Sequence, residues 1–329
     1  MPVGQRVYTD FESSQPENFE HTRRLSCITR QTVPVPSAIL PGMADQPSIA
    51  IVGAWNLATA LAISLRETGF HIDAVITRGR AASLVRARSL AAKIGSRVLS
   101  RVERAQAGLL WICVPDSAIA QAAVSLANQL EGRGRVVLHS SGVLSSDVLQ
   151  PLRATGASVA SVHPFMTFVR GSRPSLAGVP FAIEGDSQAV RIGRSIVRRL
   201  GGKPYAISKE EKNAYHAWGT FASPLLTALL AVTEQVAVLA GVPPKQARRR
   251  MVPILLQTVR NYEEFGARGG FSGPIIRGDV ATVRRHLDVL RRSPVPRQVY
   301  ATLARAALEY LPAKNKALLE RLLDSAGRS

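Results

Sequence analysis

Lys212 and His216 stand four residues apart in a segment that is predicted to be helical, so their side chains share one helix face. Ser223 lies further along the same stripe. An ammonium and an imidazole can each give a proton to an oxygen that gains negative charge during a reaction. The spacing predicts Lys212 and His216 as catalytic proton donors and Ser223 as a substrate contact. The alternative is a solvated Lys–His pair at a helix start.

Other polar side chains directly follow predicted buried strands. Ser140 and Ser141 come after an apolar run that ends at residue 138, and His163 comes after a run that ends at residue 162. Pro164 stiffens the turn that displays the His163 imidazole, which could polarise a carbonyl group or shuttle a proton. A histidine that caps nearby backbone is the alternative. We predict Ser140, Ser141 and His163 as substrate contacts.

Arg277 stands in a compact loop, residues 273–279, that enters a predicted helix. Its planar guanidinium could bind a substrate carboxylate through two parallel hydrogen bonds. Asp279 ends the loop and has the side chain of a helix N-cap. We therefore predict Arg277 as a substrate contact and explain Asp279 by capping alone.

Alternating strands and helices must position these residues. Apolar runs predict strands at 49–52, 71–76, 109–114, 135–138, 159–162 and 180–183, with a short one at 203–207. Helical patterns lie at 81–93, 117–130 and 187–200. This alternation predicts an α/β domain with a doubly wound parallel sheet. Ligands bind beyond the carboxyl ends of the strands in such sheets, which is where the serines and His163 stand.

Residues 49–58 carry the start of a dinucleotide-binding unit. Four apolar residues lead into Gly53 and a helical pattern follows at once, as in a buried strand, a tight turn and a helix start that hold a pyrophosphate. The second strand ends at Arg78 rather than at the acidic residue that holds the ribose of NAD, so we expect NADP in preference to NAD. A surface arginine is the alternative. The predicted cofactor contacts are Gly53, Ala54, Trp55, Asn56, Leu57, Arg78, Val114, Pro115 and Asp116.

The glycine motif departs from G-x-G-x-x-G at its second glycine. Trp55 stands where a glycine normally lets the backbone approach the pyrophosphate, whereas Ala58 is an accepted third residue. The fold prediction is unaffected by this change. Cofactor binding becomes conditional on where the indole lies.

The chain divides into three predicted parts. Residues 1–46 are polar and proline-containing without sustained periodicity, so we expect an N-terminal extension that is disordered or precedes the true start, for which Met43 is a candidate. Residues 47–207 are the predicted Rossmann-like dinucleotide-binding domain. From residue 209 onward the pattern is helical only, at 210–240, 244–266, 279–291 and 296–325. Residues 208–329 are therefore the predicted all-α domain.

Composition narrows the classes of protein to be considered. Cys27 and Cys113 are the only cysteines, which argues against a disulfide framework or a cysteine-based metal site and favours the cytoplasm. We predict no metal. Residues 225–239 come nearest to a membrane span, but polar residues interrupt them well short of the roughly 18–20 apolar residues required.

The net charge of +19 comes largely from arginines spread over many predicted helices. No recognisable nucleic-acid module accompanies them, and almost no aromatic residues are interleaved with them. The charge therefore favours anionic small molecules as partners over nucleic acid.

Several motifs together resemble the Rossmann-like proteins that carry a C-terminal domain of unknown function 2520. They are the Gly53 turn and the segments at 114–116, 139–142, 163–168, 215–217, 221–223 and 273–279, and the resemblance covers about residues 47–310. That family is similar to the 6-phosphogluconate dehydrogenase-like group, which includes pyrroline-5-carboxylate, ketopantoate and deazaflavin-dependent NADP reductases. The resemblance implies an NADP-binding domain, a helical domain that forms a homodimer, and a site between the two domains.

The resemblance also bears on the catalytic face. In those relatives a lysine and an asparagine one helical turn later often serve catalysis; Lys212 matches the first and His216 occupies the second place. Pro224 stands where family members usually carry asparagine, which puts this face in question.

These observations predict a cytoplasmic NADP-dependent oxidoreductase that acts on a small carbonyl or imine compound bearing a carboxylate. The alternative is a degenerate Rossmann protein that binds a ligand or partner without redox turnover. Trp55 is the residue that favours this alternative.

Overall fold

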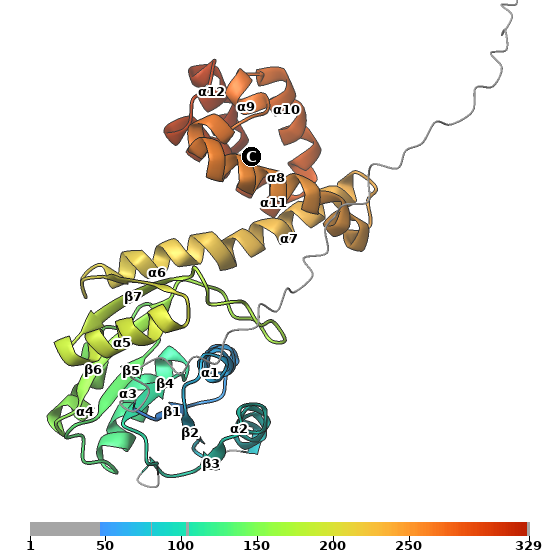
Figure 1. Ribbon diagram of the computed structural model, residues 1–329. Helices are drawn as coiled ribbons and strands as arrows, with labels where there is room; N and C mark the ends of the chain where they lie inside the picture. The colour runs from blue at the N-terminus through green and yellow to red at the C-terminus, as the bar shows by residue number, and fades with distance from the viewer. Residues whose placement is uncertain (1–46, 80, 103–104, 328–329) are drawn as a thin grey trace, which may run out of the picture. The chain divides into compact units, whose positions relative to one another are not determined.

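The computed structural model describes residues 47–79, 81–102 and 105–327, so the predicted extension at 1–46 lies outside the described residues. Its sheet has eight strands in the order β3-β2-β1-β4-β5-β6-β7-β8 (Figure 1). The strands are β1 (Ile49–Val52), β2 (Ile72–Ile76), β3 (Arg97–Leu99), β4 (Leu109–Ile112), β5 (Val136–His139), β6 (Ser158–Pro164), β7 (Pro180–Gly185) and β8 (Lys203–Ala206). Neighbouring strands from β3 to β6 pair in parallel, which confirms the predicted doubly wound sheet.

Helices cover both faces of this sheet. They are α1 (Asn56–Glu67), α2 (Ala81–Ile94), α3 (Asp116–Ala127), the 3-10 helix η3 (Ser146–Leu149), α4 (Gln150–Ala154) and α5 (Ser187–Arg199). Side chains of β1 alternate between the faces: Ile49 and Ile51 join the core under α1, α2 and α5, whereas Ala50 and Val52 join the core under α3 and α4. All four are buried, as expected for a central strand of a sheet covered on both sides.

Two strands differ from the sequence-based expectation. The β6–β7 pair is antiparallel and β8 runs parallel to β7, so the last two strands oppose the rest of the sheet. The chain between β6 and β7 forms no helix, and without a helical crossover an antiparallel return is the simple connection. Strand β3 was not predicted because it has only three residues and none of them is buried.

The rest of the chain is helical, as predicted. Its helices are α6 (Lys212–Thr220), the π-helical turn η4 (Phe221–Leu225), α7 (Leu226–Leu239), α8 (Pro244–Gly270), α9 (Pro274–Arg277), α10 (Val280–Val289), η5 (Leu290–Arg292), α11 (Pro294–Tyr310) and α12 (Lys316–Gly327). The single helix predicted at 296–325 is wrong: α11 ends at Tyr310, and Asn315 takes a positive φ of 52° before α12 begins. The predicted loop at 273–279 contains the short helix α9.

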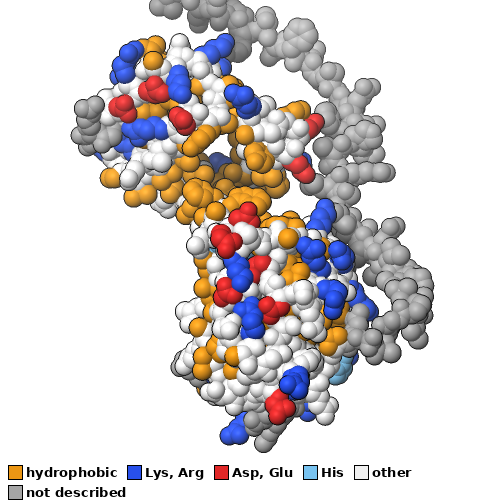
Figure 2. Space-filling view, turned by 90° about the vertical axis from the view of Figure 1, so that its left-hand side faces the viewer, with side chains coloured by type: hydrophobic (Ala, Val, Ile, Leu, Met, Phe, Trp, Pro, Cys, Tyr) orange, Lys and Arg blue, Asp and Glu red, His pale blue; other side chains and the backbone are white. Residues whose placement is uncertain are grey.

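Helices α10, α11 and α12 share a small core of their own, whereas α7 has no buried residue and α8 has one. Figure 2 shows a group of hydrophobic side chains near the middle of the view. Figure 1, from which Figure 2 is turned about the vertical axis, draws α7 and α8 at the same level. Among the described residues one segment, Lys212–Leu239, is long and apolar enough to span a membrane by length and composition. This is weak evidence for a membrane span, because Lys212, the first residue of the segment, is buried and bonds to Ser161 of the sheet.

Candidate functional site

A cavity of about 330 Å³ lies beyond the carboxyl ends of β1, β2 and β4. Gly53 forms its floor with a φ of +104°, and a Cβ there would stand 2.7 Å from the backbone oxygen of Cys113. The turn between β1 and α1 therefore requires glycine. The N-cap residue of α1, Trp55, makes no capping hydrogen bond with its side chain, and no acidic residue stands in the first turn of α1. Among the described residues this leaves the backbone N–H groups of that turn available to an anion.

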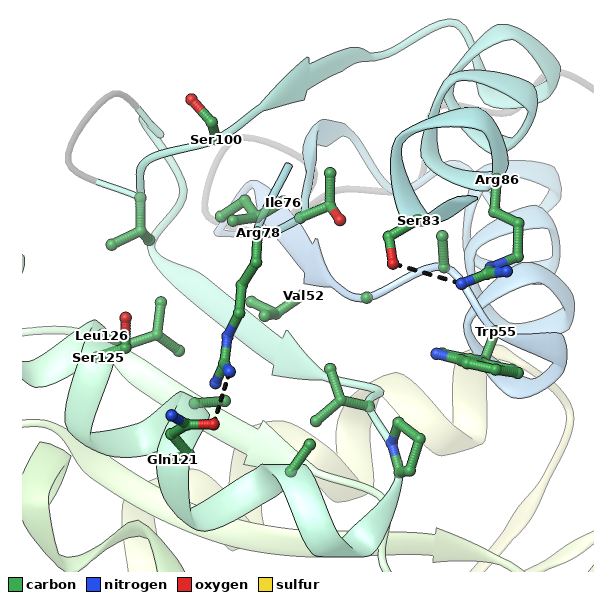
Figure 3. Close-up of a pocket in the computed structure, with 18 of the residues that line it drawn as sticks. Val52, Trp55, Ile76, Arg78, Ser83, Arg86, Ser100, Gln121, Ser125 and Leu126 are labelled. Atoms are coloured by element: carbon green, nitrogen blue, oxygen red, sulfur yellow. Dashed lines mark hydrogen bonds between the residues drawn. The ribbon is translucent and has the colours of Figure 1, made fainter. Parts of the chain in front are cut away.

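The Trp55 indole lies at the side of this cavity and does not fill it. The Arg86 guanidinium stacks over the indole, 4.4 Å from the ring centroid, and both residues line the cavity (Figure 3). Arg78 lines the cavity from the end of β2, where one of its guanidinium nitrogens donates to the Gln121 side-chain oxygen at 2.8 Å. The indole is thus a wall of the space above Gly53.

The structure brings six of the nine predicted cofactor contacts to this cavity. The lining residues among them are Gly53, Ala54, Trp55, Arg78, Val114 and Pro115. Asn56, Leu57 and Asp116 are not in the lining. The Asn56 amide instead donates to the Phe168 carbonyl at 3.2 Å, which ties the start of α1 to the loop after β6.

A second cavity, of about 380 Å³, lies between that loop and the α6–η4 segment. His163, His216 and Ser223 contribute to its lining, so three of the predicted catalytic and substrate residues meet here. The His163 Nδ1 and the Tyr215 hydroxyl are 2.8 Å apart, and the His163 ring meets both Tyr215 and His216 edge to face. Sequence and topology thus bring two imidazoles from different elements to one hollow.

Electrostatics fixes the charge states of two of these groups. Burial, followed by the positive charge of Lys212 and the interaction with the neighbouring His216 ring, lowers the pKa of His163 to about 3, so the His163 ring is neutral near pH 7. Burial raises the pKa of Tyr215 above the ordinary tyrosine value, so its hydroxyl keeps its proton. A neutral His163 can therefore accept a hydrogen bond at Nδ1 from the protonated Tyr215 hydroxyl and carry its own proton on Nε2.

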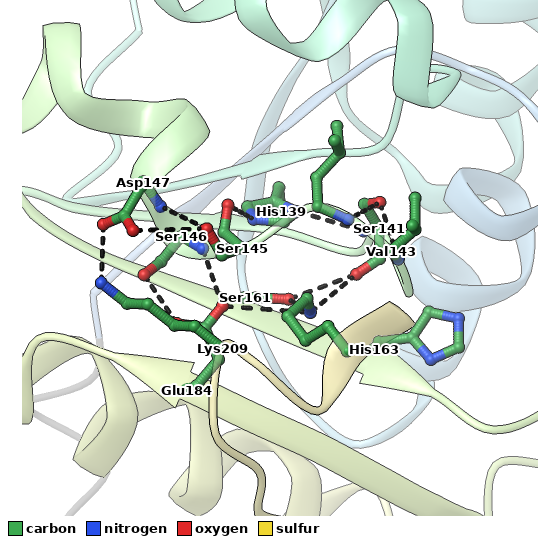
Figure 4. A network of polar contacts seen from close by, with 12 residues as sticks. His139, Ser141, Val143, Ser145, Ser146, Asp147, Ser161, His163, Glu184 and Lys209 are labelled. Carbon is green, nitrogen blue, oxygen red and sulfur yellow. Dashed lines mark hydrogen bonds and ion pairs between the residues drawn. The ribbon is translucent and has the colours of Figure 1, made fainter. Parts of the chain in front are cut away.

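Lys212 lies beneath this hollow rather than in it. Its ammonium donates to the Ser161 hydroxyl at 2.7 Å and to the Ser141 carbonyl at 3.2 Å, and Nζ lies 3.9 Å from a Glu184 carboxylate oxygen. Burial lowers the pKa of Lys212, and the nearby Glu184 carboxylate opposes that shift. Glu184 in turn accepts hydrogen bonds from the backbone and hydroxyl of Ser146 in η3, both at 2.7 Å (Figure 4). The geometry favours a lysine that fixes α6 to the sheet; its role as a proton donor stays a prediction.

The remaining predicted substrate contacts, Ser140, Ser141 and Arg277, do not line either cavity. The Ser140 hydroxyl is buried and accepts from the Trp111 indole at 2.8 Å. The Ser141 hydroxyl, also buried, accepts from the backbone of Val143 and Leu144. Arg277 is exposed at the end of α9 and lines neither cavity, whereas Asp279 caps α10 through the backbone of Thr282, as predicted. The substrate-contact predictions for these two serines and Arg277 remain untested.

Sequence reasoning missed Arg86, which lines the first cavity, and Tyr215, which bonds to His163 in the lining of the second. Arg86 had been counted among dispersed surface arginines, although its place in the helix after β2 puts it beside α1, the neighbouring helix on that face. Tyr215 was noted only as part of a motif. Its position directly before His216 was the available signal, because neighbouring residues of a helix point about 100° apart and the tyrosine would face the sheet.

Comparisons with known proteins agree with this architecture. A family model described as a Rossmann-like domain matches residues 39–164, and the model of the domain of unknown function DUF2520 matches residues 179–307. No curated protein matches the chain.

Three solved structures of similar fold carry titles that name an oxidoreductase, a reductase or a reductive aminase. An assigned NADP oxidoreductase from Bacteroides fragilis is 23% identical with a TM-score of 0.67, covering 79% of this chain and 97% of its own. An imine reductase from Myxococcus stipitatus in complex with NADP+ is 15% identical with a TM-score of 0.57, covering 84% and 100%. A reductive aminase from Aspergillus terreus in complex with NADPH and ethyl-5-oxohexanoate is 15% identical with a TM-score of 0.58, covering 84% and 99%. At these identities the likeness establishes the fold.

Proposed function

Since the chain is a Rossmann-like protein with a C-terminal domain of unknown function 2520, we propose that it is an NADP-dependent oxidoreductase for a small carbonyl or imine compound that carries a carboxylate. The observation that carries the proposal is the cavity over Gly53. It has the floor, the uncapped helix N-terminus and the cationic walls that a dinucleotide phosphate requires. The solved relatives whose titles name bound NADP+ or NADPH support the same choice of cofactor.

The residues at this cavity fit the cofactor. Gly53, Ala54 and the first turn of α1 would hold the pyrophosphate, and Arg78 would meet the adenosine ribose from the end of β2. When bound, NADPH supplies a hydride to the substrate carbon. The chain's own residues must then orient the substrate, exclude water and deliver a proton to its oxygen or nitrogen.

The second cavity supplies groups for those tasks. His163, with Nδ1 held by Tyr215, would present an Nε2–H to the substrate oxygen or nitrogen, and His216 would be the proton donor. Ser223 would orient the substrate from the η4 turn. Lys212 would hold α6, and with it His216, at the correct distance from the sheet. The Asn56–Phe168 hydrogen bond links the α1 turn to the loop beside this cavity, which supports a shared function for both.

The alternative is a degenerate Rossmann protein without redox turnover. It depends on an indole that blocks the phosphate position. The stacking of Trp55 against Arg86 at the edge of the cavity favours the enzyme instead.

Titration with NADPH tests the proposal. We expect the purified protein to bind NADPH and to gain thermal stability as the ligand concentration rises, because a ligand that binds only the folded state raises the melting temperature. The measurement is a thermal melt with NADPH from micromolar to millimolar concentration, with intrinsic tryptophan fluorescence as a second readout. No shift and no quenching at millimolar NADPH would remove the redox assignment.

We further infer that the protein acts in the cytoplasm as a homodimer formed by its helical region. Helix α7 supports the dimer, because it is almost wholly apolar, has no buried residue and therefore requires a covering partner. Exposed apolar residues of the amphipathic helix α8 add to this surface. The low cysteine content supports the compartment.

A further inference from the structure

The stacked pair Trp55–Arg86 is unusual in two respects. Trp55 takes the place of a phosphate-contacting glycine, and the residue is 49% exposed rather than packed in the core. The observed contact of its ring is the Arg86 guanidinium, which crosses from α2 to lie over the indole.

The Arg86 guanidinium stacks on the indole, but its positive charge has no acidic partner among the described residues. Its Nη2 donates to the Ser83 hydroxyl at 3.3 Å, and no carboxylate of the described residues pairs with it. Among the described residues, Arg78 on the same cavity has the neutral Gln121 amide as its side-chain hydrogen-bond partner and no acidic one. A guanidinium has five N–H donors, so two guanidiniums without acidic partners at one cavity form an anion-binding site.

The position of Arg86 indicates which anion it meets. The pyrophosphate belongs at the Gly53 turn and the α1 N-terminus, whereas the adenosine ribose lies at the end of β2. Arg86 is on α2, the helix that follows β2, and β2 ends in Thr77 and Arg78 instead of a carboxylate. A negatively charged substituent on that ribose would find Arg78 and Arg86 on the cavity wall.

We propose that Arg86 contacts the 2′-phosphate of the cofactor and that Trp55 is the positioning residue that holds it there. The pair sets the preference for 2′-phosphorylated adenine nucleotides. The inference rests on the proposed function, because it assumes that an adenine dinucleotide occupies the cavity. It gives the departure from the glycine motif a role: the indole replaces a close backbone contact with a platform for an additional arginine.

Two small nucleotides that differ only in the 2′-phosphate test the proposal by calorimetry. We expect the parent protein to bind adenosine 2′,5′-bisphosphate more tightly than AMP. Arg86→Ala should weaken binding of the bisphosphate by about 10- to 100-fold, the range expected for a charge-assisted hydrogen bond, and should leave AMP binding nearly unchanged. Arg88→Ala is the matched control, because it removes the same charge from an exposed position of α2 outside the cavity.

Variants at Trp55 separate positioning from obstruction. Trp55→Phe keeps an aromatic platform and should retain most of the preference for the bisphosphate, whereas Trp55→Gly should lose it. If Trp55→Gly instead tightens binding of both nucleotides, the indole is an obstruction and the positioning role is overturned.

The remaining outcomes distinguish this inference from the proposed function. Equal weakening of both nucleotides in Arg86→Ala would assign Arg86 to the shared phosphate and overturn only the 2′-phosphate role. A parent protein that binds neither nucleotide nor NADPH would reject the cofactor itself, and this inference with it.

Discussion

At the scale of single residues, the buried His139 and the partly buried His163 make the stability of the protein sensitive to acid. Burial is the largest cause that lowers the pKa of both His139 and His163 to about 3, and the charge of Lys212 adds to the shift. An unfolded chain protonates its histidines near pH 6.5. Between these values the unfolded state binds more protons, so the free energy of unfolding falls as the pH falls from about 6.5 to 3. Each ring contributes at most about 1.4 kcal/mol per pH unit.

Replacing one ring should reduce this pH dependence. We expect His163→Gln to lose less stability than the parent between pH 6.5 and pH 4.5, because only His139 then remains as a buried titrating ring. Urea unfolding at several pH values measures the slope. His71→Gln, at an exposed position, is the control and should keep the parent slope. Identical slopes for His163→Gln and the parent would contradict the burial argument.

Spacing along the sequence predicted which side chains share a helix face but not how deeply each one is buried. The i, i+4 relation between Lys212 and His216 was sound, yet Lys212 is buried and bonded to Ser161 whereas His216 lines the open cavity. A helical period specifies a face but not what that face contacts. The stack of Arg86 on Trp55 lay beyond sequence reasoning for the same reason, because it depends on the packing of two helices.

At the scale of elements, Pro224 explains the π-helical turn η4 between α6 and α7. Proline has no N–H to donate and its ring clashes with the carbonyl of the preceding turn, so the helix widens from Phe221 to Leu225. The widened turn carries Ser223 and Pro224 into the lining of the second cavity. The proline that departs from the family pattern therefore shapes the wall of the cavity in which we propose that the substrate binds.

Pro224→Ala should stabilise the protein by about 1 kcal/mol or more, since it restores a helical hydrogen bond and removes the clash. The same change should weaken substrate turnover because it moves Ser223. Thermal or urea unfolding measures the first effect and a steady-state assay the second. Pro253→Ala in α8, away from both cavities, is the matched control: it should also stabilise, with turnover unchanged. A Pro224→Ala variant no more stable than the parent would show that the widened turn has another cause.

The direction of a strand and the presence of short elements could not be predicted from the sequence pattern. The apolar residues of β7 have the same pattern in either direction, so only the missing helix between β6 and β7 could have indicated the antiparallel pairing. The break between α11 and α12 had a local signal in Pro312, which the continuous helical pattern outweighed. The central strands were predictable because burial on both faces makes them uniformly apolar.

At the scale of the whole molecule, α7 and α8 leave apolar surface that the described residues do not cover. Leu226 and Leu239 on α7, and Ile254, Leu256 and Phe265 on α8, are exposed. Surface of this kind is characteristic of obligate interfaces. A second copy of the chain is the partner we propose, because it would offer the same two helices.

Ile254→Glu should convert the proposed dimer to a monomer that remains folded. Ile254 is 67% exposed in the single chain, so a carboxylate there costs the monomer little, but at the interface it would be desolvated without a partner. We expect the dissociation constant to rise about 100-fold or more, measured by light scattering after size exclusion at micromolar concentration. Val85→Glu places the same charge on α2 at 66% exposure and should leave the dimer intact. A parent protein that is monomeric, or that partitions onto lipid vesicles, would contradict the dimer and assign these helices to a different partner.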